Sequence, residues 1–406
     1  MAKNVIIGQS GGPTAVINSS LAGVYKAACS LGADKVYGMK YGIEGLLKEE
    51  LVELNVLLDD RLSIELLKRT PSSYLGSCRY KLPEPEADST PYVKLFTLFD
   101  KYDICAVFYI GGNDSMDTIA KLSRYGAQVG SAVRFIGVPK TIDNDLCGTD
   151  HCPGFGSAAK YIGTTFAELE RDCHVYTTKA VTIVEVMGRD AGWLTAASCL
   201  ARANGAKGPD FIYLCEVPFS IDTFLKDVKA KLEEQDAVII AVSEGVKNKD
   251  GRYISEEVQS SAVDSFGHSY IAGAAKVLED AVRNEIGCKV RSIELNLMQR
   301  CAAHLASATD IQESRMLGKA ACQYALEGAG GMMAAVIRTS DKPYATEFKA
   351  LPVCDIANAI KSVPADYIND AGNDVTEKMV DYLTPLIQGE MNTVYENGIP
   401  KYIYLY

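Results

Sequence analysis

The feature that most constrains the fold is a repeated alternation of short apolar runs, several ending in glycine, with longer amphipathic stretches. The first cycle has an apolar run at residues 4–8, a helical pattern at 15–31 and a second apolar run at 35–39. The later apolar runs lie at 104–110, 134–138, 182–186, 211–214 and 237–243. Such alternation predicts parallel strands covered by helices. The two series predict an α/β fold of two doubly wound domains with mainly parallel sheets and a cleft between them.

The charge and the cysteine content of the chain indicate which kinds of partner it binds and in which compartment it resides. The 52 Asp and Glu residues outnumber the 41 Lys and Arg residues, and the net charge of −11 disfavours nucleic acid as a partner. No segment approaches the ~20 apolar residues of a membrane span, so no membrane partner is expected. The twelve cysteines are scattered, and Cys147, His151 and Cys152 lack the paired spacing of a zinc site. We therefore expect reduced thiols and a cytoplasmic protein.

Two glycine-containing loops follow predicted strands. The first spans residues 8–14 and contains Gly11 and Gly12, and the second spans 111–115. At the carboxyl end of a parallel strand, such a loop lets backbone N–H groups approach an anion. Each glycine pair taken alone is equally well explained as a tight turn. Neither loop matches the GxGxxG pattern, which disfavours a nicotinamide dehydrogenase.

A third loop, at residues 139–145, places Lys140, Asp143 and Asp145 after an apolar strand. Charges in such a place are unfavourable unless they are paired or bind a ligand. One carboxylate can accept a hydroxyl proton while its neighbour holds Mg²⁺, which is what phosphoryl transfer to an alcohol requires. An acidic turn that caps the next element is the alternative on spacing alone.

Two further strand ends carry Arg189 and Glu244. The planar guanidinium of arginine can bind two phosphate oxygens at once, and a carboxylate can accept hydrogen bonds from sugar hydroxyls. Each residue taken alone is better explained by a surface ion pair. The gathering of all these groups at strand ends favours a cleft that binds a phosphorylated sugar.

These residues occur in motifs that resemble, in order, those of the phosphofructokinase family. The matching motifs are Gly11-Gly12-Pro13, Gly76-Ser77-Cys78-Arg79, Gly111-Gly112-Asn113-Asp114-Ser115, residues 139–145, Met187-Gly188-Arg189, Ser243-Glu244-Gly245 and Gln299-Arg300. The run Thr141-Ile142-Asp143-Asn144-Asp145 followed by Met187-Gly188-Arg189 is the most specific part.

The resemblance implies roles for individual residues. Asp143 would be the general base that removes the proton from the C1 hydroxyl of fructose 6-phosphate. The sugar-phosphate site would comprise Thr141, Ile142, Asp143, Met187, Gly188, Arg189, Glu244, Arg291 and Arg300. The pyrophosphate site would comprise Gly11, Gly12, Arg79 and Lys140, and Mg²⁺ would bind Asn113 and Asp145. Family members commonly have aspartate at the position of Asn113.

Two positions predict the phosphoryl donor. Asp114 stands where the ATP-using members that the chain resembles have glycine, and its carboxylate would fill space and repel an α-phosphate. Lys140 stands where those members commonly have glycine, and its ammonium can stabilise charge on the transferring group. We therefore expect pyrophosphate-dependent phosphorylation of fructose 6-phosphate, with Asp143, Lys140 and Asp114 as the catalytic residues. The resemblance to pyrophosphate-dependent members implies that the reaction is reversible, as in glycolysis and gluconeogenesis. An ATP-dependent enzyme and a non-catalytic sugar-phosphate sensor remain the alternatives.

The resemblance also implies a division of the chain. Residues 1–154 plus about 300–350 would form the donor domain, residues from about 155 to 299 the fructose 6-phosphate domain, and about 351–406 an extension that packs on the body. A homodimer or homotetramer is expected. Lys179 stands near the place where bacterial relatives carry an arginine, which it would replace if that arginine crosses a subunit interface.

Overall fold

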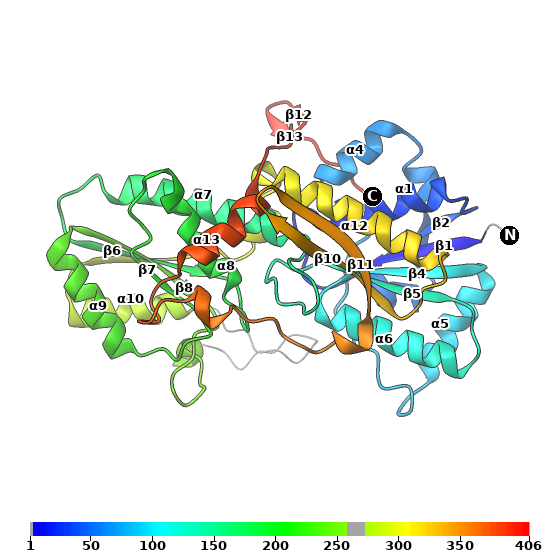
Figure 1. The fold of residues 1–406 in the computed structure, drawn as a ribbon, viewed down its shortest axis with the longest axis horizontal. Coiled ribbons are helices and arrows are strands. Elements are labelled where there is room, and N and C mark those ends of the chain that lie inside the picture. The colour runs from blue at the N-terminus through cyan, green and yellow to red at the C-terminus, as the bar shows by residue number, and fades with distance from the viewer. Residues whose placement is uncertain (1–2, 258–272, 406) are drawn as a thin grey trace.

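The computed structural model describes residues 3–257 and 273–405, which form two separate main sheets (Figure 1). The first sheet has seven strands in the order β11-β10-β5-β4-β1-β2-β3. Its central strands run parallel, whereas β3 and β11 at the two edges pair antiparallel with their neighbours. The strands are β1 (Asn4–Gln9), β2 (Val36–Met39), β3 (Leu51–Glu53), β4 (Ile104–Gly111), β5 (Arg134–Pro139), β10 (Met332–Asp341) and β11 (Tyr344–Pro352).

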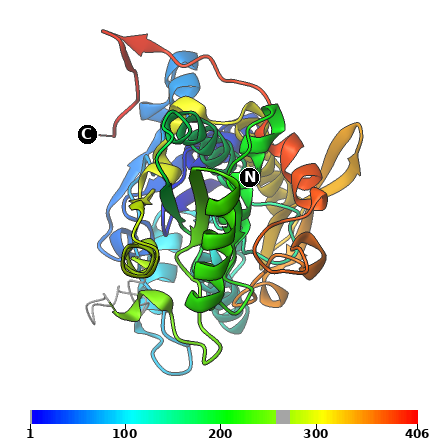
Figure 2. The same cartoon turned by 90° about the vertical axis from the view of Figure 1, so that its left-hand side faces the viewer.

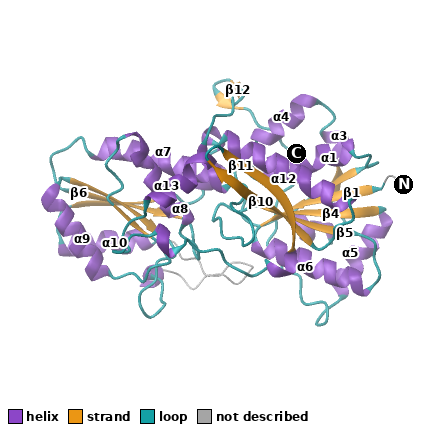
Figure 3. Cartoon of the chain, viewed as in Figure 1, coloured by secondary structure: helices purple, strands orange, loops and turns teal. Residues whose placement is uncertain are grey.

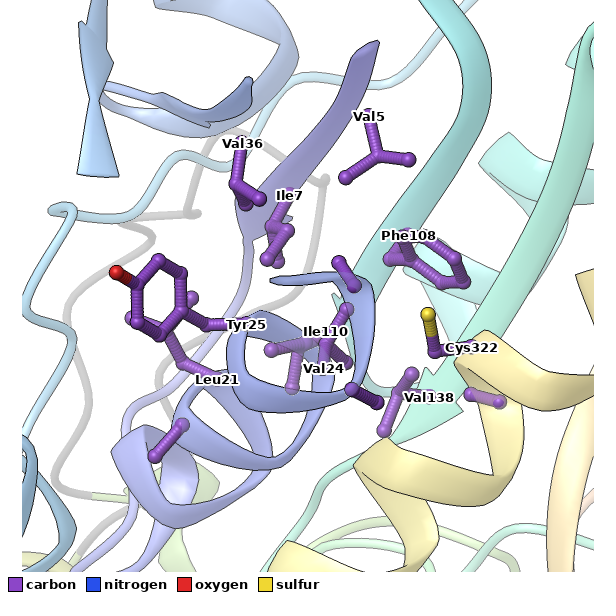
Figure 4. Close-up of a cluster of buried hydrophobic side chains, with 14 of the residues drawn as sticks. Val5, Ile7, Leu21, Val24, Tyr25, Val36, Phe108, Ile110, Val138 and Cys322 are labelled. Carbon is purple, nitrogen blue, oxygen red and sulfur yellow. The ribbon is translucent and has the colours of Figure 1, made fainter. Parts of the chain in front are cut away.

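Helices cover both faces of this sheet because its strands carry apolar side chains on both faces. In β4, Phe108 and Ile110 belong to one buried cluster, whereas Val107 and Tyr109 belong to the cluster on the opposite face. Figure 4 shows the first of these clusters, in which strand side chains meet α1. The helices of this part are α1 (Ile17–Ser30), α2 (Gly42–Leu46), α3 (Leu54–Leu57), α4 (Arg61–Arg69), α5 (Thr90–Lys101), α6 (Asn113–Gln128) and α12 (Ala308–Leu326).

The second sheet is entirely parallel, with the strand order β7-β8-β6-β9. In β6, Val181 and Ile183 face one buried cluster and Val184 and Val186 face the other, so this sheet is also covered on both sides (Figure 3). Its strands are β6 (Ala180–Val186), β7 (Phe211–Tyr213), β8 (Ala237–Ser243) and β9 (Lys289–Glu294). The helices nearby are α7 (Phe155–Cys173), α8 (Trp193–Ala196), α9 (Ile221–Glu234), α10 (Ala274–Glu285) and α11 (Met298–Cys301).

A C-terminal segment, residues 353–405, runs from the first part to the second and back. Ile356 packs in a cluster of the first sheet, and Tyr382 and Leu386 then pack in a cluster of the second. Ile403 finally packs against the first part again. The segment contains α13 (Glu377–Leu383), which lies on one flank of the second part in Figure 2, and the small β12 (Tyr395–Glu396) and β13 (Ile399–Pro400).

The predicted fold class is confirmed, and every strand predicted from an apolar run is present within a few residues. From Pro83, Pro85 and Pro91 among acidic residues, the sequence predicts an exposed loop at residues 81–92, and this prediction is wrong at the end of the segment. There α5 begins at Thr90, Pro91 occupies its first turn, and Tyr92 is fully buried. No helix within residues 3–257 and 273–405 is both long and apolar enough to cross a bilayer.

His151 is buried between two carboxylates rather than at a metal site. Its Nδ1 lies 2.8 Å from Asp150 Oδ2 and its Nε2 lies 2.7 Å from Glu313 Oε2. Burial alone would lower the pKa of His151, but the hydrogen bonds to Asp150 and Glu313 outweigh it and raise the pKa to about 9. The imidazolium form is therefore favoured in the folded state, where it joins β10 and α12 through Asp150, Arg338 and Glu313.

The raised pKa predicts a pH-dependent stability. The contribution of His151 is fully present below about pH 6.5, its unfolded value, and is lost as the pH rises through about 9. Urea unfolding of the wild type and of His151→Gln at pH 6.5 and 9.5 measures it. The difference in unfolding free energy between the two proteins should shrink by on the order of 3 kcal/mol at the higher pH. An unchanged difference would contradict the charged state of this residue.

Candidate active site

A cavity of about 410 Å³ lies where strand-end loops of the two sheets meet. Loops after β1, β4 and β5 line it from the first sheet, and loops after β6 and β8 line it from the second. The cavity brings together most of the residues predicted from the sequence. These are Gly11, Gly12, Arg79, Asn113, Asp114, Lys140, Thr141, Ile142, Asp143, Asp145, Met187, Arg189, Glu244 and Arg300.

Two predicted residues are not among the described residues that line this cavity. Gly188 lies just behind its wall, where its N–H donates to Glu244 Oε1 at 3.2 Å. Arg291 lies elsewhere, because it is near the start of β9, pairs with Thr182 near the start of β6, and lines a different cavity. The carboxyl ends of these strands face the site, so a single chain does not bring Arg291 to it.

The two glycine loops have the tight geometry expected of anion-binding turns. Gly11 has a φ of 75°, a conformation that residues with a Cβ rarely adopt. A Cβ on Gly111 would lie 1.8 Å from Ser115 Oγ, so only glycine fits between β4 and the first turn of α6. The amino end of α6 lies directly at the cavity, because Asn113, Asp114 and Ser115 line it. The amino end of a helix favours a bound anion.

The turn after β5 holds Asp143 and Asp145 on the cavity side. Burial, together with the nearby charge of Asp145, raises the pKa of Asp143 to about 7. Burial also raises the pKa of Asp145. The backbone N–H of Asp143 donates to Thr141 Oγ1 at 3.1 Å, which closes the turn locally. A carboxylate with a pKa near neutrality is basic enough to take a proton from a bound hydroxyl.

Lys140 is buried at the junction of the turn and the first glycine loop. Its ammonium donates to the carbonyl oxygen of Gly12. Burial lowers the pKa of Lys140 to about 8, although the nearby charge of Asp143 opposes this shift. A phosphate anion bound beside this ammonium would restore its charged form, since an opposite charge favours ionisation.

On the side of the second sheet, a carboxylate and two guanidinium groups face the same space. Burial and the charge of Asp143 raise the pKa of Glu244 to about 7. Burial and the charge of Arg79 lower the pKa of Arg300. The Nε of Arg189 is buried and has no hydrogen-bond partner in the described part of the chain. The unpaired Nε of Arg189 and the closeness of the cations Arg79 and Arg300 fit an anion with several oxygens.

The residues predicted to hold a metal fit a hard divalent cation. Asn113 Nδ2 lies 3.5 Å from Asp145 Oδ2, and the buried Asn113 Oδ1 has no hydrogen-bond partner among the described residues. Amide and carboxylate oxygens are the donors that Mg²⁺ prefers. Within residues 3–257 and 273–405 no three His, Cys, Asp or Glu side chains form a metal cluster, so bound phosphates would have to supply further oxygens.

Comparison with known families agrees with this arrangement. Residues 4–325 match the family described as phosphofructokinase. The chain belongs to the phosphofructokinase family.

Individual relatives of this phosphofructokinase cover nearly its full length. The pyrophosphate–fructose 6-phosphate 1-phosphotransferase of Halomonas elongata is 40% identical over 403 residues, which cover 98% of this chain and 95% of the relative. A solved pyrophosphate-dependent phosphofructokinase from Marinobacter aquaeolei has a TM-score of 0.87 and 37% identity, and the match covers 98% of this chain and 95% of that one. A sulfofructose kinase of Alkalicoccus urumqiensis is 33% identical, covering 93% of this chain and 95% of the relative.

Five residues that line the cavity of this phosphofructokinase were not predicted from the sequence. Lys81 lies two residues after Arg79, and Asp190 and Ala191 directly follow Arg189, so the motifs that contain these arginines point to all three. Asn358 and Ile360 come from the C-terminal segment, where no periodic pattern or glycine loop signals a site.

The closeness of Gly12 to Arg300 yields a prediction. A Cβ at Gly12 would lie 3.1 Å from Arg300 Nη1 and would force the guanidinium to move. With pyrophosphate as the probe, calorimetry should show roughly tenfold weaker binding to Gly12→Ala, a loss of about 1.4 kcal/mol. Gly330→Ala, where the nearest atom to the new Cβ is 3.5 Å away, is the matched control. Equal affinities in both variants would exclude this loop from the anion site.

Proposed function

We propose that this phosphofructokinase reversibly transfers a phosphoryl group from pyrophosphate to the C1 hydroxyl of fructose 6-phosphate, giving fructose 1,6-bisphosphate and phosphate. The proposal rests on one observation: Asp143, the buried Lys140 and Asp114 line the same cavity. The names of the full-length relatives support the same donor and acceptor.

Asp143 has the role of general base. The side chain lies between the glycine loops of the first sheet and the Arg189–Glu244 side of the second, so a sugar held on that side would present its hydroxyl to the carboxylate. As the C1 oxygen bonds to the transferring phosphorus, its proton passes to Asp143 and the bond to the departing phosphate breaks. In the reverse direction the protonated carboxyl returns that proton to the sugar oxygen.

Lys140 and the arginines would stabilise the negative charge of the phosphates and would not transfer protons. The ammonium beside Gly12 would stabilise the developing charge on the transferring or departing phosphate. Arg79 and Arg300 lie close enough to influence each other electrostatically, and a diphosphate between them would relieve their repulsion. Arg189 would hold the phosphate of the sugar.

A divalent metal requirement is general in this family, and we propose Mg²⁺ held by Asn113 and Asp145. When bound, the ion neutralises phosphate oxygens and orients the donor for in-line attack. Asn113 begins α6 after β4, and Asp145 lies in the turn after β5, so the ion would require both strand ends to be correctly positioned.

The proposed donor follows from space and charge near α6. Asp114 lies in the first turn of α6 and lines the cavity. Its carboxylate would oppose the α-phosphate of a nucleotide, whereas pyrophosphate ends before that point. ATP dependence is the competing hypothesis, and activity with ATP but none with pyrophosphate would establish it. A non-catalytic sensor would bind fructose 6-phosphate without turnover in either direction.

The remaining assignments are also proposals. We assign residues 1–154 plus about 300–350 to the donor side, about 155–299 to the sugar-phosphate side, and the rest to the extension. We propose a homodimer or homotetramer and a cytoplasmic location. The oligomer is supported by the position of Arg291, which is exposed near the start of β9 and away from the cavity. Lys179 is exposed at the same end of the second sheet and pairs with Glu233 at 3.2 Å. In an oligomer both residues would be available to a neighbouring subunit.

The base role of Asp143 predicts a large loss of turnover in Asp143→Asn. The substitution keeps the shape but removes the proton acceptor, so kcat should fall by roughly 10²–10⁴-fold with little change in sugar-phosphate binding. A coupled assay with pyrophosphate in both directions measures kcat, and Asp250→Asn on an exposed loop is the control. Weakened binding with unchanged kcat would contradict the role.

The donor hypothesis predicts a gain of nucleotide binding. Asp114→Gly should admit ATP to the cavity, and the double variant with Lys140→Gly should show the greater ATP turnover because it matches the residues of ATP-using members. Calorimetry with ATP and assays with both donors measure the change. The steric hypothesis is wrong if the double variant has no detectable affinity for ATP.

A further inference from the structure

The turn that carries the two cavity carboxylates has a buried residue at its centre. Asn144, between Asp143 and Asp145, has a φ of 57°, a left-handed conformation that asparagine tolerates better than most residues. It is fully buried, while its two neighbours line the cavity. The turn therefore places two carboxylates on one side by directing the side chain between them into the protein.

The side chain of Asn144 is held from behind by the C-terminal segment. Its Nδ2 donates to the hydroxyl of Tyr382 at 2.9 Å, and its Oδ1 accepts from Lys361 Nζ at 3.3 Å. The backbone N–H of Cys152 also donates to Oδ1, at 3.0 Å. Two of these three partners come from the segment that crosses between the sheets in Figure 1.

Lys361 contacts the turn through its backbone as well as its side chain. Its N–H donates to the carbonyl oxygen of Asp145 at 2.8 Å. Its ammonium also donates to the carbonyl oxygens of Thr149 at 3.1 Å and Asp150 at 2.8 Å. Its own carbonyl accepts from Trp193 Nε1 at 2.8 Å, so one residue connects the carboxylate turn to the second part.

Tyr382 completes the support from α13. Its hydroxyl donates to the carbonyl oxygen of Asp150 at 2.7 Å while accepting from Asn144. Arg338 packs its guanidinium 4.7 Å from the ring centroid, which further fixes the ring. Of the described residues that line the cavity, none is Lys361 or Tyr382, so neither can act on a ligand directly.

We propose that Lys361 and Tyr382 are positioning residues, which hold Asn144 in its left-handed conformation and thereby aim Asp143 and Asp145 at the bound substrates. The inference rests on the proposed roles of these two carboxylates. Both positioning residues lie outside residues 4–325 that match the family. Through these two residues the C-terminal segment contributes to turnover from behind the cavity wall.

Two substitutions test the proposal in the full-length protein. Tyr382→Phe removes one hydroxyl, and Lys361→Met removes three side-chain hydrogen bonds while keeping an unbranched chain. Each should lower kcat roughly 10- to 100-fold, because small displacements of catalytic groups have large effects on rate. KM for fructose 6-phosphate and for pyrophosphate should stay within about twofold, since the phosphate-binding groups remain in place.

Matched controls separate positioning from general destabilisation. Tyr367→Phe makes the same change in the same aromatic cluster, 6.2 Å from the ring of Tyr382. Lys378→Met removes a lysine of the same segment that pairs only with Asp366 among its described ion-pair partners. Both controls should retain wild-type kcat. If Lys361→Met fails to fold, Tyr382→Phe, the milder change, decides.

The kcat of Asp143→Asn, measured in parallel, shows whether a negative result contradicts the positioning role of Lys361 and Tyr382 or the proposed base role of Asp143. Adding Tyr382→Phe to Asp143→Asn should lower kcat much less than Tyr382→Phe lowers it in the wild type, because the base is gone and only Asp145 remains to be displaced. Wild-type kcat in folded Tyr382→Phe and Lys361→Met, or an equal loss in the controls, would overturn the inference alone. Wild-type turnover in Asp143→Asn would overturn the assignment of the turn and the inference with it.

Discussion

Buried charge in the turn after β5 is the constraint on which the site depends. Asp143, Asp145 and Lys140 come within six residues of chain and face one cavity, where burial alone shifts each toward its neutral form. Such a cluster is tolerated only where opposite charges and fixed hydrogen bonds surround it. The surrounding structure supplies both, through the glycine loops in front and the C-terminal segment behind.

The net charge of the chain says little about this cavity. Five cationic side chains and five acidic ones line it, although the whole chain carries −11. The cations, Arg79, Lys81, Lys140, Arg189 and Arg300, come from both sides of the space between the sheets. The two polyanionic substrates proposed here would therefore bind by local complementarity, while the acidic remainder of the surface disfavours long anionic polymers.

Much of the fold could be predicted because its determinants are local in sequence. The uncharged run that became β4 predicted a buried parallel strand, and the loops after successive strands meet because parallel strands share a carboxyl edge. The sequence could not place Arg291, which the resemblance assigned to the sugar phosphate, because its position near the start of β9 depends on how the strands pair. It also could not find Lys361, because its contact with Asn144 joins positions 217 residues apart in a segment without regular periodicity.

The place of β10 in the first sheet has a consequence for how the protein is made. β10 pairs with β5, yet the entire second sheet is encoded between them. During synthesis, the edge of β5 that later pairs with β10 stays without its partner strand until roughly two hundred more residues have left the ribosome. Until β10 pairs, the unpaired edge of β5 can pair with strands of other chains, so aggregation competes with folding at this stage.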